Sequence, residues 1–154
     1  MKLEEALKME RFASPQQKAM LEIIYTANWL LSSMASMLKP FGVSEQQFNV
    51  LRILRGSHPR PMNMQDIQGR MLTPTSNATR LVEKLRLKGY VERNLCEQNR
   101  RKVEIEITDE GLRFLERLDV ELKAQQSVIQ EQLTEADAEK ISALLEHMRR
   151  SQKE

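Results

Sequence analysis

Between residues 75 and 84 the chain sets short hydroxyl and amide side chains beside two cations. These candidate residues are Thr75, Ser76, Asn77, Thr79, Arg80 and Lys84. Side chains of these types can contact DNA in the major groove, where arginine reads guanine edges, asparagine reads adenine, and serine or threonine reads either base. If the segment opens a helix, its N-terminal amides can also hold a phosphate.

The apolar residues of the same segment decide which side chains are available. Spaced at about 100° per residue, they share one face of a helix, which we expect to lie in the core. They are Ala78, Leu81, Val82 and Leu85. Ser76 and Arg80 then lie on the opposite face. Any surface helix presents polar residues outward, but serine, threonine and asparagine are poor helix formers that lower stability when they do not pack. The pattern therefore favours a contact with DNA.

A second cluster of polar and cationic residues lies between two short strand patterns. It consists of Asn99, Arg100, Arg101 and Lys102. The next residues alternate, with Val103 and Ile105 on one face of a strand and Glu104 and Glu106 on the other, so the cations crowd the tip of a hairpin. A narrow minor groove concentrates negative potential and attracts arginine. Arg101 would supply that contact, and the acidic strand face would turn away from DNA. A solvated turn without a partner is the alternative.

Four more cations are candidates for phosphate contacts: Arg70, Arg86, Lys88 and Arg93. Some of them could instead pair with acidic neighbours, which are Asp66, Glu92 and Glu97. Because surface ion pairs contribute only about 0 to 1 kcal/mol, such pairing would stabilise the fold little.

Other chemistries have weaker support. No glycine-rich phosphate loop and no nucleophile paired with a histidine stands in the required context, so the sequence does not predict an enzyme. His58, His147 and Cys96 lie in separate elements without ligand spacing, so we predict no metal site and no other cofactor. Cys96 lies near the basic hairpin and could act as a thiol switch. A lone cysteine at a strand end is more often a small, half-buried side chain.

A binding site for a small apolar ligand has better support than a metal site or a thiol switch. Tyr25, Trp29, Met34 and Met37 give the first long helix an aromatic and thioether surface, and methionine adapts to irregular apolar sites. We hypothesise that these four residues line a pocket for a small apolar or aromatic ligand. Methionines at helical spacing can alternatively fill a core or a dimer interface.

Composition and charge distribution indicate the size of the domain, the kind of partner and the cellular compartment. The chain has 154 residues, 40% hydrophobic content and a net charge of +2, which suits one domain with helical extensions. Residues 63–102 hold nine lysines and arginines against four acidic residues, whereas residues 103–154 hold seven against thirteen. This polarity indicates one face for an anionic partner. A single cysteine, the lack of a signal-peptide pattern and the lack of a bilayer-spanning apolar run predict a cytoplasmic protein without a membrane partner.

Six helices and one hairpin are expected to position these residues. The expected helix starts carry caps or capping patterns at Ser14, Ser44, Asn63, Thr73, Thr108 and Thr134. The first helix runs to about Leu38, the second to about Arg55, and the fourth to a glycine cap at Gly89. Residues 90–95 and 103–107 form the hairpin.

This order of elements is typical of a winged helix-turn-helix, a mainly α fold in which a small β-hairpin forms the wing. We assign residues 44–107 to this DNA-binding domain. Residues 1–43 form an N-terminal helical segment, and residues 108–154 form C-terminal helices. Both flanks carry long apolar stripes that exceed what the central core can cover, so a second surface must cover them.

From Gln47 to Gly111 the chain resembles the multiple antibiotic resistance regulator (MarR) family of bacterial transcription factors. The resemblance rests on the order and spacing of six short motifs. They are Phe48-Asn49-Val50-Leu51, Met64-Gln65-Asp66-Ile67, Ala78-Thr79-Arg80-Leu81-Val82-Glu83-Lys84-Leu85, Lys88-Gly89-Tyr90-Val91-Glu92-Arg93, Asn99-Arg100-Arg101 and Ile107-Thr108-Asp109-Glu110-Gly111. The resemblance implies a symmetric dimer joined through the helices of residues 1–43 and 108–154, with one winged helix-turn-helix per subunit for double-stranded DNA. For many members it also implies a small-molecule or redox signal that releases the DNA.

One position departs from the family's pattern. The residue two before the inserted arginine is usually an aspartate in the family, and here it is Asn99. Asparagine can accept a hydrogen bond but brings no charge, so Arg101 would be held less rigidly.

We therefore expect a homodimeric transcriptional repressor on a pseudo-palindromic operator, with two recognition helices in successive major grooves about one helical turn apart. A winged-helix module that contacts protein instead of DNA is the main alternative. It would not need Arg80 opposite the core face together with an arginine pair at the hairpin tip. A monomeric DNA binder is the second alternative, and the apolar stripes at both ends disfavour it.

Overall fold

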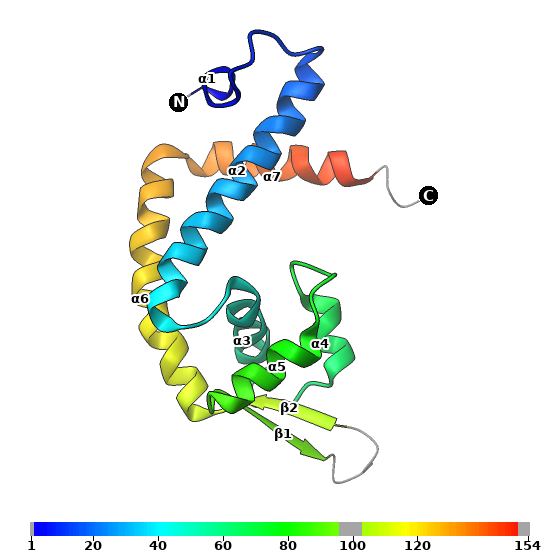
Figure 1. Cartoon of the computed structure of the whole chain (residues 1–154), viewed down its shortest axis with the longest axis vertical. Helices are drawn as coiled ribbons and strands as arrows, with labels where there is room; N and C mark the ends of the chain where they lie inside the picture. The colour runs from blue at the N-terminus through cyan, green and yellow to red at the C-terminus, as the bar shows by residue number, and fades with distance from the viewer. Residues whose placement is uncertain (1, 96–102, 151–154) are drawn as a thin grey trace. The chain divides into compact units, whose positions relative to one another are not determined.

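The computed structural model describes residues 2–95 and 103–150. Residues 1–108 and 109–154 form two compact units, and each is treated by itself below. The described chain is mainly helical, with one two-stranded antiparallel hairpin (Figure 1). This confirms the predicted fold class. In the same part of the chain, no helix is both long enough and apolar enough to cross a membrane.

The elements follow the expected order with two short additions. The first unit contains α1 (Leu3–Leu7), α2 (Pro15–Leu38), the 3-10 helix η1 (Lys39–Phe41), α3 (Glu45–Ser57), α4 (Met64–Arg70), α5 (Ala78–Leu87), β1 (Val91–Leu95) and β2 (Val103–Ile107). The second unit contains α6 (Asp109–Gln132) and α7 (Glu135–Arg150). Helix α1 and η1 were not predicted, because a single turn of helix carries no apolar period.

Most of the predicted caps start their helices. The Ser14 hydroxyl accepts a hydrogen bond of 3.1 Å from the amide of Gln17, the third residue of α2. Ser44 and Gln47 form a reciprocal capping box on α3, with hydrogen bonds of 3.2 and 2.9 Å. Asn63 and Thr134 cap α4 and α7 by accepting hydrogen bonds from the backbone amides of Asp66 and Asp137, at 2.8 and 3.2 Å. Because each cap satisfies an amide that lacks an intrahelical partner, these starts are set locally.

Helix α5 begins later than predicted, so the assignment of Thr73 as its cap is wrong. The cap is Asn77, whose Oδ1 accepts a hydrogen bond of 3.0 Å from the Arg80 amide. Residues 72–77 form a turn in which the Ser76 amide donates to the Thr73 carbonyl at 3.0 Å. The Pro74 carbonyl is bound by the side chain of Gln68 at 2.7 Å. The backbone at Pro74 is therefore held by another element and does not open the helix.

Helices α3, α4 and α5 share a core with the hairpin. Helix α3 contacts α4, α5 and β2, and α5 contacts β1 (Figure 1). The buried side chains of these elements include Phe48, Leu51, Leu54, Ile67, Ala78, Leu81, Val82, Leu85, Val91, Ile105 and Ile107. The predicted core face of the fourth helix is confirmed by its four members in this set. Burial of a valine, leucine or isoleucine side chain contributes about 1.5–3 kcal/mol, so this face fixes the rotation of α5 about its axis.

One residue outside the two strands also pairs with the hairpin through its backbone. Strands β1 and β2 pair antiparallel, with Val91 opposite Ile107 at the base. Met62, which precedes α4, exchanges two backbone hydrogen bonds of 3.0 and 2.8 Å with Ile105. The chain entering α4 is therefore fixed to the hairpin.

Two of the long flanking helices, α2 and α7, bury much less. Leu38 is the one buried side chain of α2, and α7 has no buried residue in its described range. The large apolar side chains that α2 exposes are Met20, Ile24, Tyr25, Trp29, Leu30 and Leu31. Those of α7 are Ile141, Leu144 and Met148. By contrast, α6 buries Phe114, Leu115, Leu118 and Leu122.

Candidate nucleic-acid interface

The outward face of α5 presents polar and cationic side chains. Thr79, Arg80 and Lys84 are exposed, while the four core residues of the helix are buried. Neither Arg80 nor Lys84 forms an ion pair with another described residue. Both cations are therefore available to an external anion.

The turn before α5 holds the other predicted base-reading residues. Thr75 and Asn77 are exposed. Asn77 uses its Oδ1 to cap α5, which occupies one of the two acceptor positions of this oxygen and fixes the orientation of the side chain. Bidentate reading of adenine needs both the oxygen and the nitrogen directed at one base edge, so the amide nitrogen is the atom of Asn77 that is fully available while it caps the helix.

Ser76 does not point outward as the helical pattern predicted. Its Oγ is buried and has no hydrogen-bond partner among the described residues. The helical period does not apply to Ser76, because the helix begins two residues later, at Ala78. A contact between this hydroxyl and DNA requires rotation of the side chain.

Arg86 differs from the other cations of α5 because it is already paired. Its Nε and Nη2 donate to the two carboxylate oxygens of Glu83 at 3.0 and 2.8 Å. This hydrogen bonding is the main cause that lowers the pKa of Glu83, and the charges of Arg86 and Arg93 lower it further. The pKa of Arg86 is raised by the same carboxylate. Arg86 is therefore held along the helix surface.

The remaining phosphate candidates lie in three places. Arg70 ends α4. The ammonium of Lys88 lies beside Gly42. Arg93, on β1, lines a surface hollow of about 310 Å³ together with Arg86. The structure thus brings Arg86 and Arg93 together.

The predicted tip of the wing falls outside the part of the chain that the structure describes. Asn99, Arg100, Arg101 and Lys102 lie outside the described residues. The same holds for Cys96, the candidate thiol switch.

Two amide side chains that the sequence did not single out hold the turn before α5. Asn49 of α3 accepts a hydrogen bond of 3.0 Å from the Leu72 amide. Gln68 of α4 donates to the Pro74 carbonyl at 2.7 Å and accepts from the Ala78 amide at 3.1 Å. No local pattern marks these residues, since their partners lie six to twenty-three positions further along the chain.

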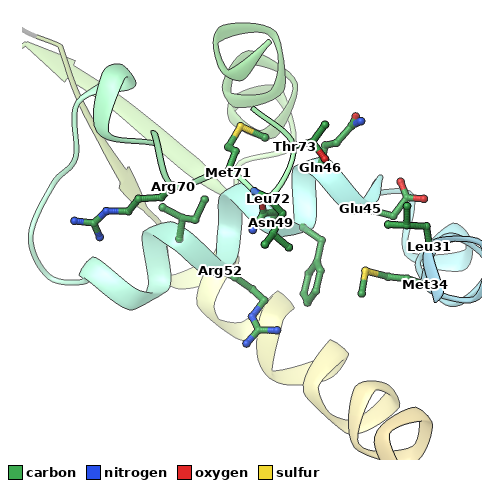
Figure 2. Close-up of a pocket in the computed structure, with 12 residues that line it drawn as sticks. Leu31, Met34, Glu45, Gln46, Asn49, Arg52, Arg70, Met71, Leu72 and Thr73 are labelled. Atoms are coloured by element: carbon green, nitrogen blue, oxygen red, sulfur yellow. Dashed lines mark hydrogen bonds between the residues drawn. The ribbon is translucent and has the colours of Figure 1, made fainter. Parts of the chain in front are cut away.

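A cavity of about 430 Å³ lies between α2, α3 and the residues that follow α4 (Figure 2). Its lining is mainly apolar but includes three charged side chains. The lining residues are Leu31, Met34, Glu45, Gln46, Phe48, Asn49, Arg52, Ile53, Arg70, Met71, Leu72 and Thr73. Of the four predicted pocket residues, Met34 lines this cavity, whereas Tyr25 and Trp29 are exposed on α2 and Met37 is half-buried elsewhere on that helix.

Within residues 2–95 and 103–150, no three histidine, cysteine or acidic side chains are grouped closely enough to hold a metal ion.

Comparison with known proteins agrees with this geometry. A model described as MarR family matches residues 43–103. The transcriptional repressor MprA of Escherichia coli strain K12 is 28% identical over 86 residues, which are 56% of this chain and 49% of MprA. The chain thus spans about half the length of that curated relative.

Solved structures match over most of the chain. A MarR transcription factor from Planctomyces limnophilus is 31% identical, with a TM-score of 0.68 over 88% of this chain and 98% of that one. The S. aureus MepR–DNA complex has a TM-score of 0.69 at 22% identity, over 82% of this chain and 96% of that one. The second likeness concerns the fold alone.

Proposed function

Because the chain belongs to the MarR family, whose members are transcription regulators and not enzymes, we propose that it is a homodimeric repressor that binds a specific double-stranded DNA sequence. The observation that carries this proposal is the outward face of α5. Arg80 and Lys84 stand there without ion pairs to described residues, opposite a fully buried core face. Unpaired cations on a helix that a core fixes in rotation suit the anionic major groove.

Helix α5 would lie in the major groove, with Arg80 directed at a guanine edge and Lys84 at a phosphate. Thr75, Thr79 and the amide nitrogen of Asn77 would complete the contacts at the start of the helix. The wing would place Arg101 in the adjacent minor groove, with Asn99, Arg100 and Lys102 beside it. Arg70, Lys88 and Arg93 remain candidates for phosphate contacts, as does Arg86 if it leaves Glu83.

The dimer would form through the flanking helices. The exposed apolar side chains of α2 lie on more than one side of that helix, since Ile24 and Leu31 lie roughly opposite Trp29 at about 100° per residue. A helix that is apolar all round is normally buried. A second copy supplies matching apolar helices, and a two-fold axis places two α5 helices about 34–36 Å apart, in successive major grooves.

The cavity between α2, α3 and residues 70–73 is the candidate effector site. Its volume, about 430 Å³, falls within the range of small-molecule pockets, roughly 300–1,000 Å³. Its apolar lining suits a small apolar or aromatic ligand. Because Leu72 and Thr73 of this lining begin the turn before α5, an occupant would change DNA affinity.

Selection of duplexes from a random-sequence pool by the purified chain tests DNA recognition. We expect enrichment of a pseudo-palindrome with half-sites about 10 base pairs apart. The logarithm of affinity should fall with the logarithm of salt concentration, with a slope of about −0.9 per phosphate neutralised. A pool that stays random would favour the alternative, a winged-helix module that contacts protein. A reporter gene with the selected duplex in its promoter then tests repression.

The wing has its own test. Arg101→Ala should weaken binding to the selected duplex and reduce the preference for A·T-rich flanks. Arg101→Lys is the matched control, because it keeps the charge but not the guanidinium. Equal affinity of wild type and Arg101→Ala at every salt concentration would remove the wing from the mechanism.

Thermal-shift screening with small apolar and aromatic compounds tests the effector site. A compound that binds should raise the melting temperature of the wild type and lower its affinity for the selected duplex. Met34→Trp, which fills part of the cavity, should lose both effects. A shift that persists in Met34→Trp would place the ligand elsewhere.

A further inference from the structure

The turn of residues 72–77 must place the start of α5, the proposed recognition helix. Most side chains of this turn are nevertheless exposed. Leu72 is 87% exposed, and Thr73, Pro74, Thr75 and Asn77 are exposed as well. The buried anchors flank the turn, at Met71 before it and Ala78 after it. Apolar packing therefore fixes the two ends of the segment and leaves its path open.

Three side-chain hydrogen bonds define that path. The Asn49 carbonyl oxygen holds the first amide of the turn, at Leu72, over 3.0 Å. The Gln68 amide nitrogen holds the middle of the turn, at the Pro74 carbonyl, over 2.7 Å. The Gln68 carbonyl oxygen holds the Ala78 amide, the first amide of α5, over 3.1 Å.

The Gln68 side chain has both of its functional groups engaged. An amide side chain can donate to a carbonyl through its nitrogen and accept from a backbone amide through its oxygen at the same time. The Ala78 amide belongs to the first turn of α5, where amides have no intrahelical acceptor. Gln68 therefore acts together with the Asn77 cap in fixing where α5 begins.

We propose that Asn49 and Gln68 are positioning residues for DNA recognition: they hold the turn so that Thr75, Asn77 and Arg80 reach the bases in one register. This inference rests on the proposed function. Base-edge hydrogen bonds need fixed geometry, whereas phosphate attraction tolerates displacement. Loss of the tethers should therefore reduce specific binding and leave non-specific binding nearly intact.

The variants remove or keep the hydrogen bonds that each of the two amide side chains makes to the turn. Gln68→Met keeps the length of the side chain and removes both hydrogen bonds. Gln68→Glu keeps the acceptor for the Ala78 amide but sets a carboxylate oxygen against the Pro74 carbonyl. Asn49→Leu removes the acceptor for the Leu72 amide, whereas Asn49→Asp keeps an acceptor oxygen at this position. Gln65→Met, at an exposed position on α4, is the matched control.

Affinity is measured for a duplex selected by the wild type and for a random-sequence duplex of equal length. We expect Gln68→Met and Asn49→Leu each to lose about ten-fold in affinity for the selected duplex, with random-duplex affinity and salt slope within about two-fold of the wild type. In the ratio of the two affinities, Gln68→Glu should lie between Gln68→Met and the wild type. Asn49→Asp adds a negative charge, so it should lose affinity for both duplexes but keep the wild-type ratio, and Gln65→Met should match the wild type. Unchanged selected-duplex affinity in Gln68→Met and Asn49→Leu, or equal loss on both duplexes in these two variants, would overturn the proposal.

Hydrogen exchange in the DNA-free protein separates this inference from the proposed function. Gln68→Met should accelerate exchange at the Ala78 amide, and Asn49→Leu should accelerate it at the Leu72 amide. Unchanged exchange would show that the side chains of Asn49 and Gln68 do not hold the turn, and the proposal would fail whatever the result of the DNA-binding measurements. Faster exchange in a chain that selects no duplex would instead count against the proposed function.

Discussion

Helices α2 and α5 expose opposite chemistries. Helix α2 presents large apolar side chains, among them Trp29 and Leu30, whereas α5 presents Arg80 and Lys84 above a buried core face. Apolar surface is stabilised when it leaves water, at about 25 cal/mol per Å². Cations on a surface stay hydrated until an anion replaces the water. We therefore propose that the α2 surface meets a second copy of the chain and that the α5 surface meets DNA.

The largest expected effect is the loss of the dimer on Trp29→Asp. Trp29 is 55% exposed in the single chain, and large aromatic side chains dominate the energetics of interfaces. A carboxylate at this position would be buried without a partner, so we expect a monomer at micromolar concentration and a fall of about a hundred-fold or more in affinity for the selected duplex.

Analytical ultracentrifugation and a DNA titration measure the two effects. Trp29→Phe is the matched control, because it keeps an aromatic ring and should stay dimeric. A Trp29→Asp chain that remains a dimer would break the assignment of the α2 surface.

The next largest effect should be a loss of DNA binding from changes in α5 that leave the dimer intact. Arg80→Ala should cost about 1–3 kcal/mol in binding to the selected duplex, relax specificity at one base position, and leave the dimer intact. Lys84→Ala should instead weaken binding to all sequences nearly equally and reduce the salt slope by about one. Dissociation of either variant into monomers would mean that the α5 surface also belongs to the dimer interface.

The residues that could be predicted are those governed by their neighbours in the chain. The helix caps at Ser14, Ser44 and Thr134 depend on amides three residues away. The core face of α5 follows from a period that packing enforces. The alternation of Ile105 and Ile107 in β2 likewise follows from the geometry of a strand that is buried on one side.

The features that could not be predicted depend on distant residues. Helix α5 starts at Ala78 because Asn77 caps it and Gln68, ten positions away, binds its first amide. Ser76 lies before that start, so its orientation does not follow the helical period. The cavity draws its lining from α2, α3 and residues 70–73, and the aromatic and thioether side chains of α2 alone identified only Met34 among them.

A smaller effect concerns the paired cation of α5. Glu83→Gln should raise affinity for all duplexes about two- to five-fold and increase the salt slope, because it removes an acidic charge and releases Arg86 toward a phosphate. The pKa of Glu83 is lowered by Arg86, so the ion pair persists at neutral pH and breaks only when the pH falls below the usual range of a glutamate.

Glu83→Gln and the wild type should therefore differ by the same factor from pH 8 down to about pH 5. Fluorescence anisotropy of a labelled duplex over this range measures the difference. An affinity for DNA that Glu83→Gln leaves unchanged or lowers would mean that Glu83 positions Arg86 for DNA instead of withholding it.

The smallest expected effect tests whether exposure alone defines the α2 surface. Leu87, the last residue of α5, is 73% exposed, which is more than Trp29. It stands on a helix whose other exposed residues are polar, so a single apolar side chain there gives a partner little area to cover. Leu87→Ser should leave the dimer unchanged and alter stability by no more than about 0.5 kcal/mol. Analytical ultracentrifugation of Leu87→Ser and Trp29→Asp under the same conditions measures the difference. A weaker dimer of the Leu87→Ser chain would show that the α5 surface also contributes to the dimer interface.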